Sequence, residues 1–124
     1  MTTRYLICGR REDADEALDQ TALSAIILHP QDAVVIHGNA RARKGHGESY
    51  DRLAGKWAQA HGAQVITETA DWDLHGRAAG PIRNATMLKK HDPDVVVAFP
   101  GGRGTRDMIA RARRAKVVVI EVTE

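Results

Sequence analysis

Apolar residues along the chain follow two patterns that alternate from one end to the other. Five short, continuous runs rich in β-branched residues are typical of strands buried on both faces of a parallel sheet. Between these runs, apolar residues such as Ala14, Leu18, Ala22 and Ala25 recur at the spacing of an amphipathic helix. The predicted strands span residues 5–8, 33–36, 65–66, 95–99 and 117–122.

Capping and breaking residues indicate where the first two helices begin and end. The first helix is expected to open at Asp13 and to end at Pro30, which cannot continue a helix. The second is expected to start at a cap supplied by Ser49 or Asp51 and to stop at Gly62.

The second half of the chain is predicted to contain two more helices. Pro81 is tolerated in a first helical turn, so a helix is expected over residues 82–90. Thr105 is a good N-cap for a last helix over residues 107–115. Residues 67–80 show no regular pattern and are predicted to be irregular.

Strict alternation of strand and helix predicts an α/β fold with a five-stranded parallel sheet, helices on both faces and right-handed crossovers. The length of 124 residues suits one Rossmann-like, three-layer domain over residues 1–124. In the expected strand order 3-2-1-4-5, the order reverses between the first and fourth strands. Ligands of such folds bind at this reversal, outside the carboxyl ends of the strands.

The loop after the fourth strand, PGGRGT at residues 100–105, is the clearest candidate for a binding site. Its proline ends the strand, and its glycines allow a close backbone approach. A strand, a glycine turn and a helix start together favour an anion, because free N–H groups and the helix dipole converge there. A purely structural turn is the alternative. The residues expected to hold a phosphate are Pro100, Gly101, Gly102, Arg103, Gly104 and Thr105.

Basic residues are concentrated in the connections that meet at the predicted ligand edge, although the formal net charge is only +2. Arginine suits phosphate because its planar fork can donate two hydrogen bonds at once. The residues concerned are Arg10, Arg11, Arg41, Arg43, Lys44, Arg77, Arg103 and Arg106, with Arg83 near the start of the third helix.

Composition limits which cellular location and which cofactors can be expected for this protein. A single cysteine, Cys8, excludes an internal disulfide, and the absence of a signal-peptide pattern agrees with a cytoplasmic location. A hydrophobic fraction of 43% predicts no membrane span. The histidines His37, His46 and His75 lie on separate segments without ligand spacing, so no metal and no cofactor are expected. Trp72, in an irregular stretch, either stacks on a base or packs its own loop onto the core.

Four segments together resemble a known superfamily over almost the whole chain: CGRR from residue 8, HGNARARKGHGESYDRLAGKWA from 37, ADWDLHGRAAGPIRN from 70 and FPGGRGTRDM from 99. They are similar to the SLOG superfamily, in its small YspA/YpsA-related branch. The resemblance implies a Rossmann-like domain that binds nucleotides or nucleotide-derived ligands. Some members, the LOG phosphoribohydrolases, cleave the N-glycosidic bond of nucleoside 5′-monophosphates; others sense ADP-ribose-type signals or process DNA.

The catalytic relatives carry PGGxGTxxE, and here Met108 stands at the position of the glutamate. Asp107 is one residue early, which on a helix turns its carboxylate by about 100°. The relatives' RKxxM motif is matched from Arg83 to Met87, which keeps the arginine. Candidates for catalysis are Arg83, Asp107 and Glu48. Beside the glycine loop, the expected ligand site comprises Gly9, Arg10, Gly38, Asn39, Asp51, Trp72, Arg83 and Asn84.

The leading hypothesis is therefore the binding, for sensing or sequestration, of a nucleotide-derived ligand such as an ADP-ribose-type signal or a mononucleotide. A phosphoribohydrolase is the first alternative. A single-stranded DNA binder is the second, but with five aromatic residues it lacks stacking platforms, so nucleic acid is not the expected partner. A homodimer or higher oligomer is also expected, since members of this superfamily commonly self-associate.

Overall fold

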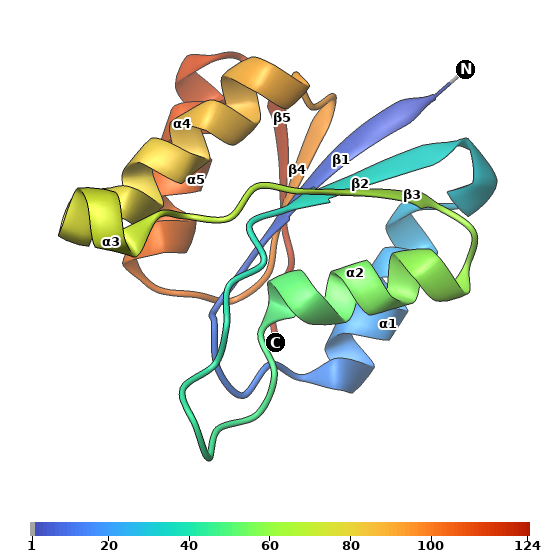
Figure 1. Ribbon diagram of the computed structural model, residues 1–124. Coiled ribbons are helices and arrows are strands. Elements are labelled where there is room, and N and C mark those ends of the chain that lie inside the picture. The colour runs from blue at the N-terminus through green and yellow to red at the C-terminus, as the bar shows by residue number, and fades with distance from the viewer. Residues whose placement is uncertain (1) are drawn as a thin grey trace.

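The computed structural model describes residues 2–124 and consists of a parallel sheet with helices on both faces (Figure 1). The sheet has the order β3-β2-β1-β4-β5, which confirms the expected α/β class and strand order. Tyr5 of the central strand pairs with Val35 on one side and Val95 on the other. The strands are β1 (Thr3–Cys8), β2 (Ala33–His37), β3 (Gln64–Thr67), β4 (Val95–Ala98) and β5 (Val118–Glu121).

The helices form two layers, one on each face of the sheet. Helices α1 (Glu16–Ile26) and α2 (Tyr50–Ala60) lie together on one face, and α4 (Ala79–His91) and α5 (Arg103–Arg114) lie on the other (Figure 1). The remaining turns are the short helix α3 (Trp72–His75) and the 3-10 turns η1 (Pro30–Asp32) and η2 (Gly76–Ala78).

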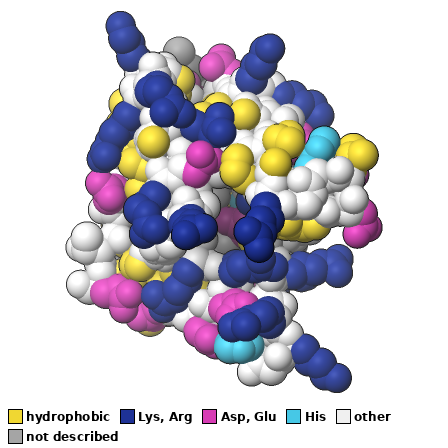
Figure 2. All heavy atoms as spheres, turned by 90° about the vertical axis from the view of Figure 1, so that its left-hand side faces the viewer, with side chains coloured by type: hydrophobic (Ala, Val, Ile, Leu, Met, Phe, Trp, Pro, Cys, Tyr) yellow, Lys and Arg dark blue, Asp and Glu magenta, His cyan; other side chains and the backbone are white. Residues whose placement is uncertain are grey.

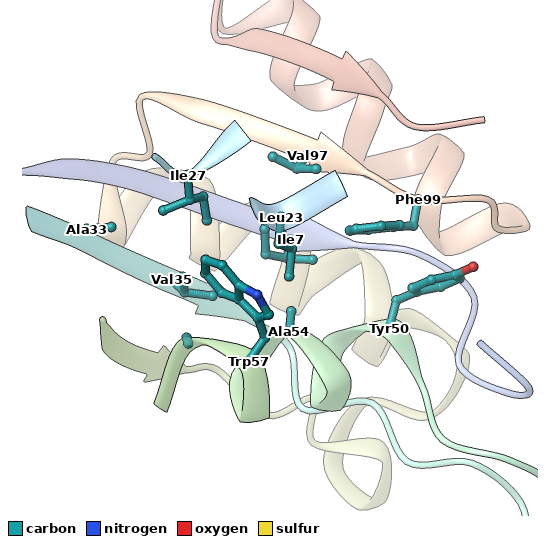
Figure 3. Close-up of a cluster of buried hydrophobic side chains, with 11 residues drawn as sticks. Ile7, Leu23, Ile27, Ala33, Val35, Tyr50, Ala54, Trp57, Val97 and Phe99 are labelled. Carbon is teal, nitrogen blue, oxygen red and sulfur yellow. The ribbon is translucent and has the colours of Figure 1, made fainter. Parts of the chain in front are cut away.

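The central strands are buried on both faces, because successive side chains of a strand point to opposite sides. Ile7 and Val97 belong to the cluster under α1 and α2, whereas Leu6 and Val96 belong to the cluster under α4 and α5. Figure 3 shows the first cluster, in which the rings of Tyr50 and Phe99 stack with their centroids 4.6 Å apart. The stacked pair lies near the carboxyl end of β1 and packs beneath the loop that follows that strand.

The first helix is shorter than its apolar periodicity predicts. Asp13 has a left-handed φ of +52° and lies in the turn before the helix, so it does not open it. Asp15 is the N-cap instead, because its side chain accepts a hydrogen bond from the N–H of Leu18 at 3.1 Å. In the second helix, Ser49 is the cap, with its hydroxyl accepting from the N–H of Arg52 at 3.1 Å.

Two expectations about the second half of the chain are wrong. Residues 67–80 are not irregular throughout, since they contain α3 and η2 and lead directly into α4. The last helix begins at Arg103, so Thr105 lies inside its first turn and is not its N-cap. The glycines here suggested a loop from their low helix propensity, but the N–H of Arg106 donates to the carbonyl of Gly102 at 3.0 Å and starts the helix early.

Candidate functional site

A cavity of about 820 Å³ lies at the carboxyl ends of the strands, between the loops after β1, β2, β3 and β4 and the first turns of α4 and α5. Its volume falls within the range of about 300–1,000 Å³ that is usual for ligand sites. Figure 2 shows Lys and Arg side chains gathered around a recess on this face. The cavity brings together the following residues named from the sequence: Gly9, Arg10, Gly38, Asn39, Asp51, Trp72, Arg83, Asn84, Gly102, Arg103, Gly104, Thr105 and Asp107.

Three of the expected ligand-site and catalytic residues do not line the cavity, and neither do the basic residues Arg43, Lys44 and Arg106. The carboxylate of Glu48 faces away and contacts Lys56 at 3.3 Å. Pro100 supports the loop from behind, since its carbonyl accepts the N–H of Arg10 at 2.9 Å. A Cβ on Gly101 would overlap the hydroxyl of Thr105, so this glycine is required by the close packing of the protein itself.

The start of α5 offers hydrogen-bond donors without partners inside the helix. No side chain caps this end, and the first helical N–H groups, those of residues 103–105, have no acceptor one turn earlier. Gly102 has a φ of −106°, and a Cβ on Gly102 or on Gly104 would meet no atom within 4 Å. No neighbouring atom and no positive φ therefore requires glycine at either position, although both line the cavity. This excludes a left-handed turn as the reason for Gly102.

The side chain of Thr105 adds a polar group to the same end of the cavity. The residue is only 6% exposed, and its hydroxyl makes no hydrogen bond within residues 2–124. Because Thr105 lines the cavity, its hydroxyl can hydrogen-bond to a molecule bound there.

Two of the cavity's arginines are held by the protein itself. Arg10 donates twice to the carbonyl of Asp13, at 2.8 and 3.2 Å, and pairs with Glu124 at 3.1 Å. Arg11 donates twice to the carbonyl of Arg41, at 3.0 and 3.2 Å. Their guanidinium groups brace the loops after β1 and β2. They give the cavity positive charge but few free hydrogen-bond donors.

Arg83 is anchored in a way that leaves part of its guanidinium group free. Its Nη1 donates to the carbonyl of Gly38 at 2.8 Å, and its Nε donates to Asn84 Oδ1 at 3.1 Å. A Cβ on Gly38 would overlap this guanidinium group, which explains the glycine there. The second terminal nitrogen, Nη2, has no hydrogen-bond partner within residues 2–124 and belongs to a side chain that lines the cavity.

Positive charge exceeds negative charge around the cavity. Two carboxylates line it, those of Asp51 and Asp107. Three exposed arginines, Arg41, Arg77 and Arg103, have no ion pair or side-chain hydrogen bond in the described part of the chain. A cavity with uncompensated guanidinium groups favours an anionic ligand. The lining arginines are Arg10, Arg11, Arg41, Arg77, Arg83 and Arg103.

Asn84 connects α4 to the start of α5. Its Nδ2 donates to the carbonyl of Gly104 at 3.1 Å and to Asp107 Oδ2 at 3.0 Å, and Arg111 Nε donates to the same oxygen at 2.8 Å. Met108 is fully buried in the core and does not line the cavity. The catalytic candidate Asp107 therefore lies at the cavity, whereas Met108, at the position of the relatives' glutamate, does not.

Asp51 is buried at the floor of the cavity and is 6% exposed. Its Oδ2 accepts the N–H of Ala40 at 3.1 Å, which ties the loop after β2 to the start of α2. Burial raises the pKa of the Asp51 carboxyl, partly offset by this hydrogen bond and by the positive charge of Arg83. Burial, followed by the charge of Asp51, raises the pKa of the Cys8 thiol, which disfavours the reactive thiolate form.

The long basic loop after β2 is fastened to the loop after β1. Asp13 Oδ1 accepts the N–H of Gly47 at 2.6 Å, and Arg43 pairs with Glu12 at 2.7 Å. The ligand atoms of Glu12, Asp13 and His46 lie within 4.8 Å of one another. A guanidinium group so close to Glu12 opposes a cation there, so the cluster serves as a clasp between the loops.

The apolar part of the cavity, lined by Ala70, Pro81 and Met87, was not predicted from the sequence. Only Met87 carried a signal, because it lies on the same face of α4 as Gly80 and Asn84 at helical spacing.

A doubly wound parallel sheet with a positively charged cavity at its switch point places the chain among the Rossmann-like α/β proteins. Within this class, the chain belongs to the YspA, cpYpsA-related SLOG family, whose model matches residues 3–75. It is also similar to the Gene 61 protein of Mycobacterium phage D29, with 39% identity over 126 aligned positions that cover 94% of each chain. Among residues 2–124, no helix is both long enough and apolar enough to cross a membrane.

Proposed function

We propose that this protein binds a nucleotide-derived ligand, with a phosphate group at the start of α5. The observation that carries the proposal is the pair Gly102 and Gly104, which line the cavity although no atom of the protein excludes a Cβ at either position. Glycine there keeps space beside unpartnered N–H groups, as a phosphate requires.

Charge and family membership support the same function. The free donors of Arg41, Arg77 and Arg103 surround the cavity and suit an anion with several oxygens. Membership of the SLOG family suggests a nucleotide-related ligand. An ADP-ribose-type signal and a mononucleotide are the candidates, and the protein would act by sensing or sequestering the ligand.

Calorimetric titration with ADP-ribose, cyclic ADP-ribose, AMP and NAD tests the proposal, in the parent protein and in two variants. In Gly102→Ala, the added methyl group meets no protein atom, so the melting temperature is expected to stay within a few degrees. Its affinity is expected to fall at least tenfold, or about 1.4 kcal/mol, because the methyl group obstructs the phosphate. Thr105→Val, which removes the unpartnered hydroxyl, is expected to weaken binding without destabilising the fold.

Arg114→Ala, at the far end of α5, is the control and should bind as the parent does. If the parent binds one of these compounds and both site variants bind it equally well, the phosphate does not lie at the start of α5. If the parent binds none of them, the proposed function has no support.

A phosphoribohydrolase is the second candidate, and the position of Asp107 at the cavity favours it. In such a reaction, water attacks the anomeric carbon of a nucleoside monophosphate, the bond from that carbon to the base breaks with its electron pair leaving on the base, and a proton from the water ends on the base. Chromatography of AMP after long incubation should then show adenine and ribose 5-phosphate. Asp107→Asn is expected to abolish this turnover and to retain AMP binding. Turnover that persists in this variant would exclude Asp107 as the catalytic carboxylate.

A further inference from the structure

The segment after β3 projects from the body of the protein beside the cavity. Every residue from 71 to 78 is exposed, although the segment is ordered as α3 and η2. Asp71 caps it by accepting the N–H of Leu74 at 3.0 Å, and Gly76, with a φ of +56°, joins its two turns. We call residues 71–78 the α3 hook. The α3 hook buries no side chain of its own, so its helical turns are held by local capping.

One side of the α3 hook faces the cavity and presents an aromatic ring. Trp72 lines the cavity and is 51% exposed, whereas Trp57 is 5% exposed in the core. The ring of Trp72 lies on α4, where it would be 3.6 Å from a Cβ on Gly80. A half-exposed indole in the wall of a cavity is a surface on which another flat ring can stack. The apolar residues Ala70, Pro81 and Met87 line the same cavity.

The aromatic end and the phosphate end of the cavity arise from different strands. The α3 hook follows β3 and the start of α5 follows β4, and β2 and β1 lie between these two strands. The cavity thus has unpartnered N–H groups where α5 begins and an aromatic ring where the α3 hook packs on α4.

We infer that the Trp72 end is a subsite for the heteroaromatic ring of the ligand, which stacks on the indole while its phosphate is bound at Gly102 and Thr105. This inference rests on the proposed function and adds the ligand's orientation and the residue that selects for a base. Base stacking on an aromatic side chain contributes on the order of tenfold to a hundredfold in affinity.

The test compares probes with and without a base. AMP and ADP-ribose carry phosphate and adenine, whereas ribose 5-phosphate carries the phosphate and sugar alone. Trp72→Ala is expected to weaken binding of AMP and ADP-ribose at least tenfold and to leave ribose 5-phosphate unaffected. Trp72→Phe should restore most of the lost affinity, because phenylalanine retains a stacking surface. Leu74→Ala, an exposed position of the same hook, should bind every probe as the parent does.

Fluorescence provides a second measurement. AMP should change the indole emission of the parent protein but not that of Trp72→Phe, whose only indole is Trp57. An equal loss for AMP and ribose 5-phosphate in Trp72→Ala, or an unchanged affinity for AMP, overturns the ring subsite and leaves the phosphate site standing. If the parent binds none of the three probes, the proposed function fails and the inference fails with it.

Discussion

Replacing Arg83 by methionine is expected to weaken nucleotide binding at least a hundredfold, or by about 2.7 kcal/mol. The guanidinium group is held by Gly38 and Asn84, which leaves Nη2 free at the cavity in a fixed position. A donor that is already oriented loses little entropy when it binds an anion. Calorimetric titration with the compound that the parent protein binds measures the loss.

The same substitution is expected to lower the free energy of unfolding by about 2 kcal/mol, because it removes hydrogen bonds of a charged group. It also leaves the buried carboxyl of Asp51 without its nearby positive charge. The double variant Asp51→Asn/Arg83→Met separates the two effects: stability should partly recover, and affinity should not. A recovery of affinity in the double variant would show that Arg83 acts through the fold and does not contact the ligand.

Replacing Asp19 by asparagine is expected to stabilise the protein by an amount that grows by about 4 kcal/mol between pH 4 and pH 8. Asp19 is 1% exposed on α1, and its Oδ1 has no hydrogen-bond partner within residues 2–124. Burial, followed by the charge of Glu16, raises the pKa of this carboxyl to about 7. Denaturant unfolding of both proteins across this pH range measures the difference.

The direction of this pH dependence follows from how tightly the folded and the unfolded states bind the proton of Asp19. The unfolded carboxyl titrates near 3.8 and the folded one near 7, so the folded state binds the proton more tightly. The stability of the parent due to Asp19 is therefore complete below pH 3.8 and is lost as the pH rises to 7. A constant difference between variant and parent across this range would show that Asp19 is not held in its neutral form.

His37 makes the stability depend on pH in the opposite direction to Asp19. This dependence provides a check on the Asp19→Asn measurement. Burial, followed by the charges of Arg52 and Arg83, lowers the pKa of its imidazole from 6.5 to about 4. Its Nδ1 accepts the N–H of Asn39 at 2.9 Å, which requires that nitrogen to be unprotonated. The stability due to His37 is therefore complete above pH 6.5 and is lost as the pH falls towards 4. In Asp19→Asn this acid-side loss should remain, because it does not depend on Asp19.

The sequence by itself determined the class of fold, the strand order and the edge where the cavity lies. Val96 and Val97, buried on opposite faces, illustrate why: a strand covered on both sides must be apolar throughout, and that run is visible without a structure. The strand order 3-2-1-4-5 is one of the common orders for such sheets, and once it is assumed the cavity position follows from the general rule for parallel sheets. The arginine-rich connections and the glycine loop could be placed at that edge for the same reason.

Only the tertiary structure decided what each of those residues does there. Gly38 and Gly101 are glycines because Arg83 and Thr105 pack against them, whereas Gly102 faces open space, and the three look alike in the sequence. The surroundings of neighbouring residues likewise depend on the tertiary structure: on α5, Asp107 lines the cavity, whereas Met108 is buried in the core. The physical reason is that periodicity reports which side of an element is buried, whereas capping, bracing and close approach depend on partners far along the chain.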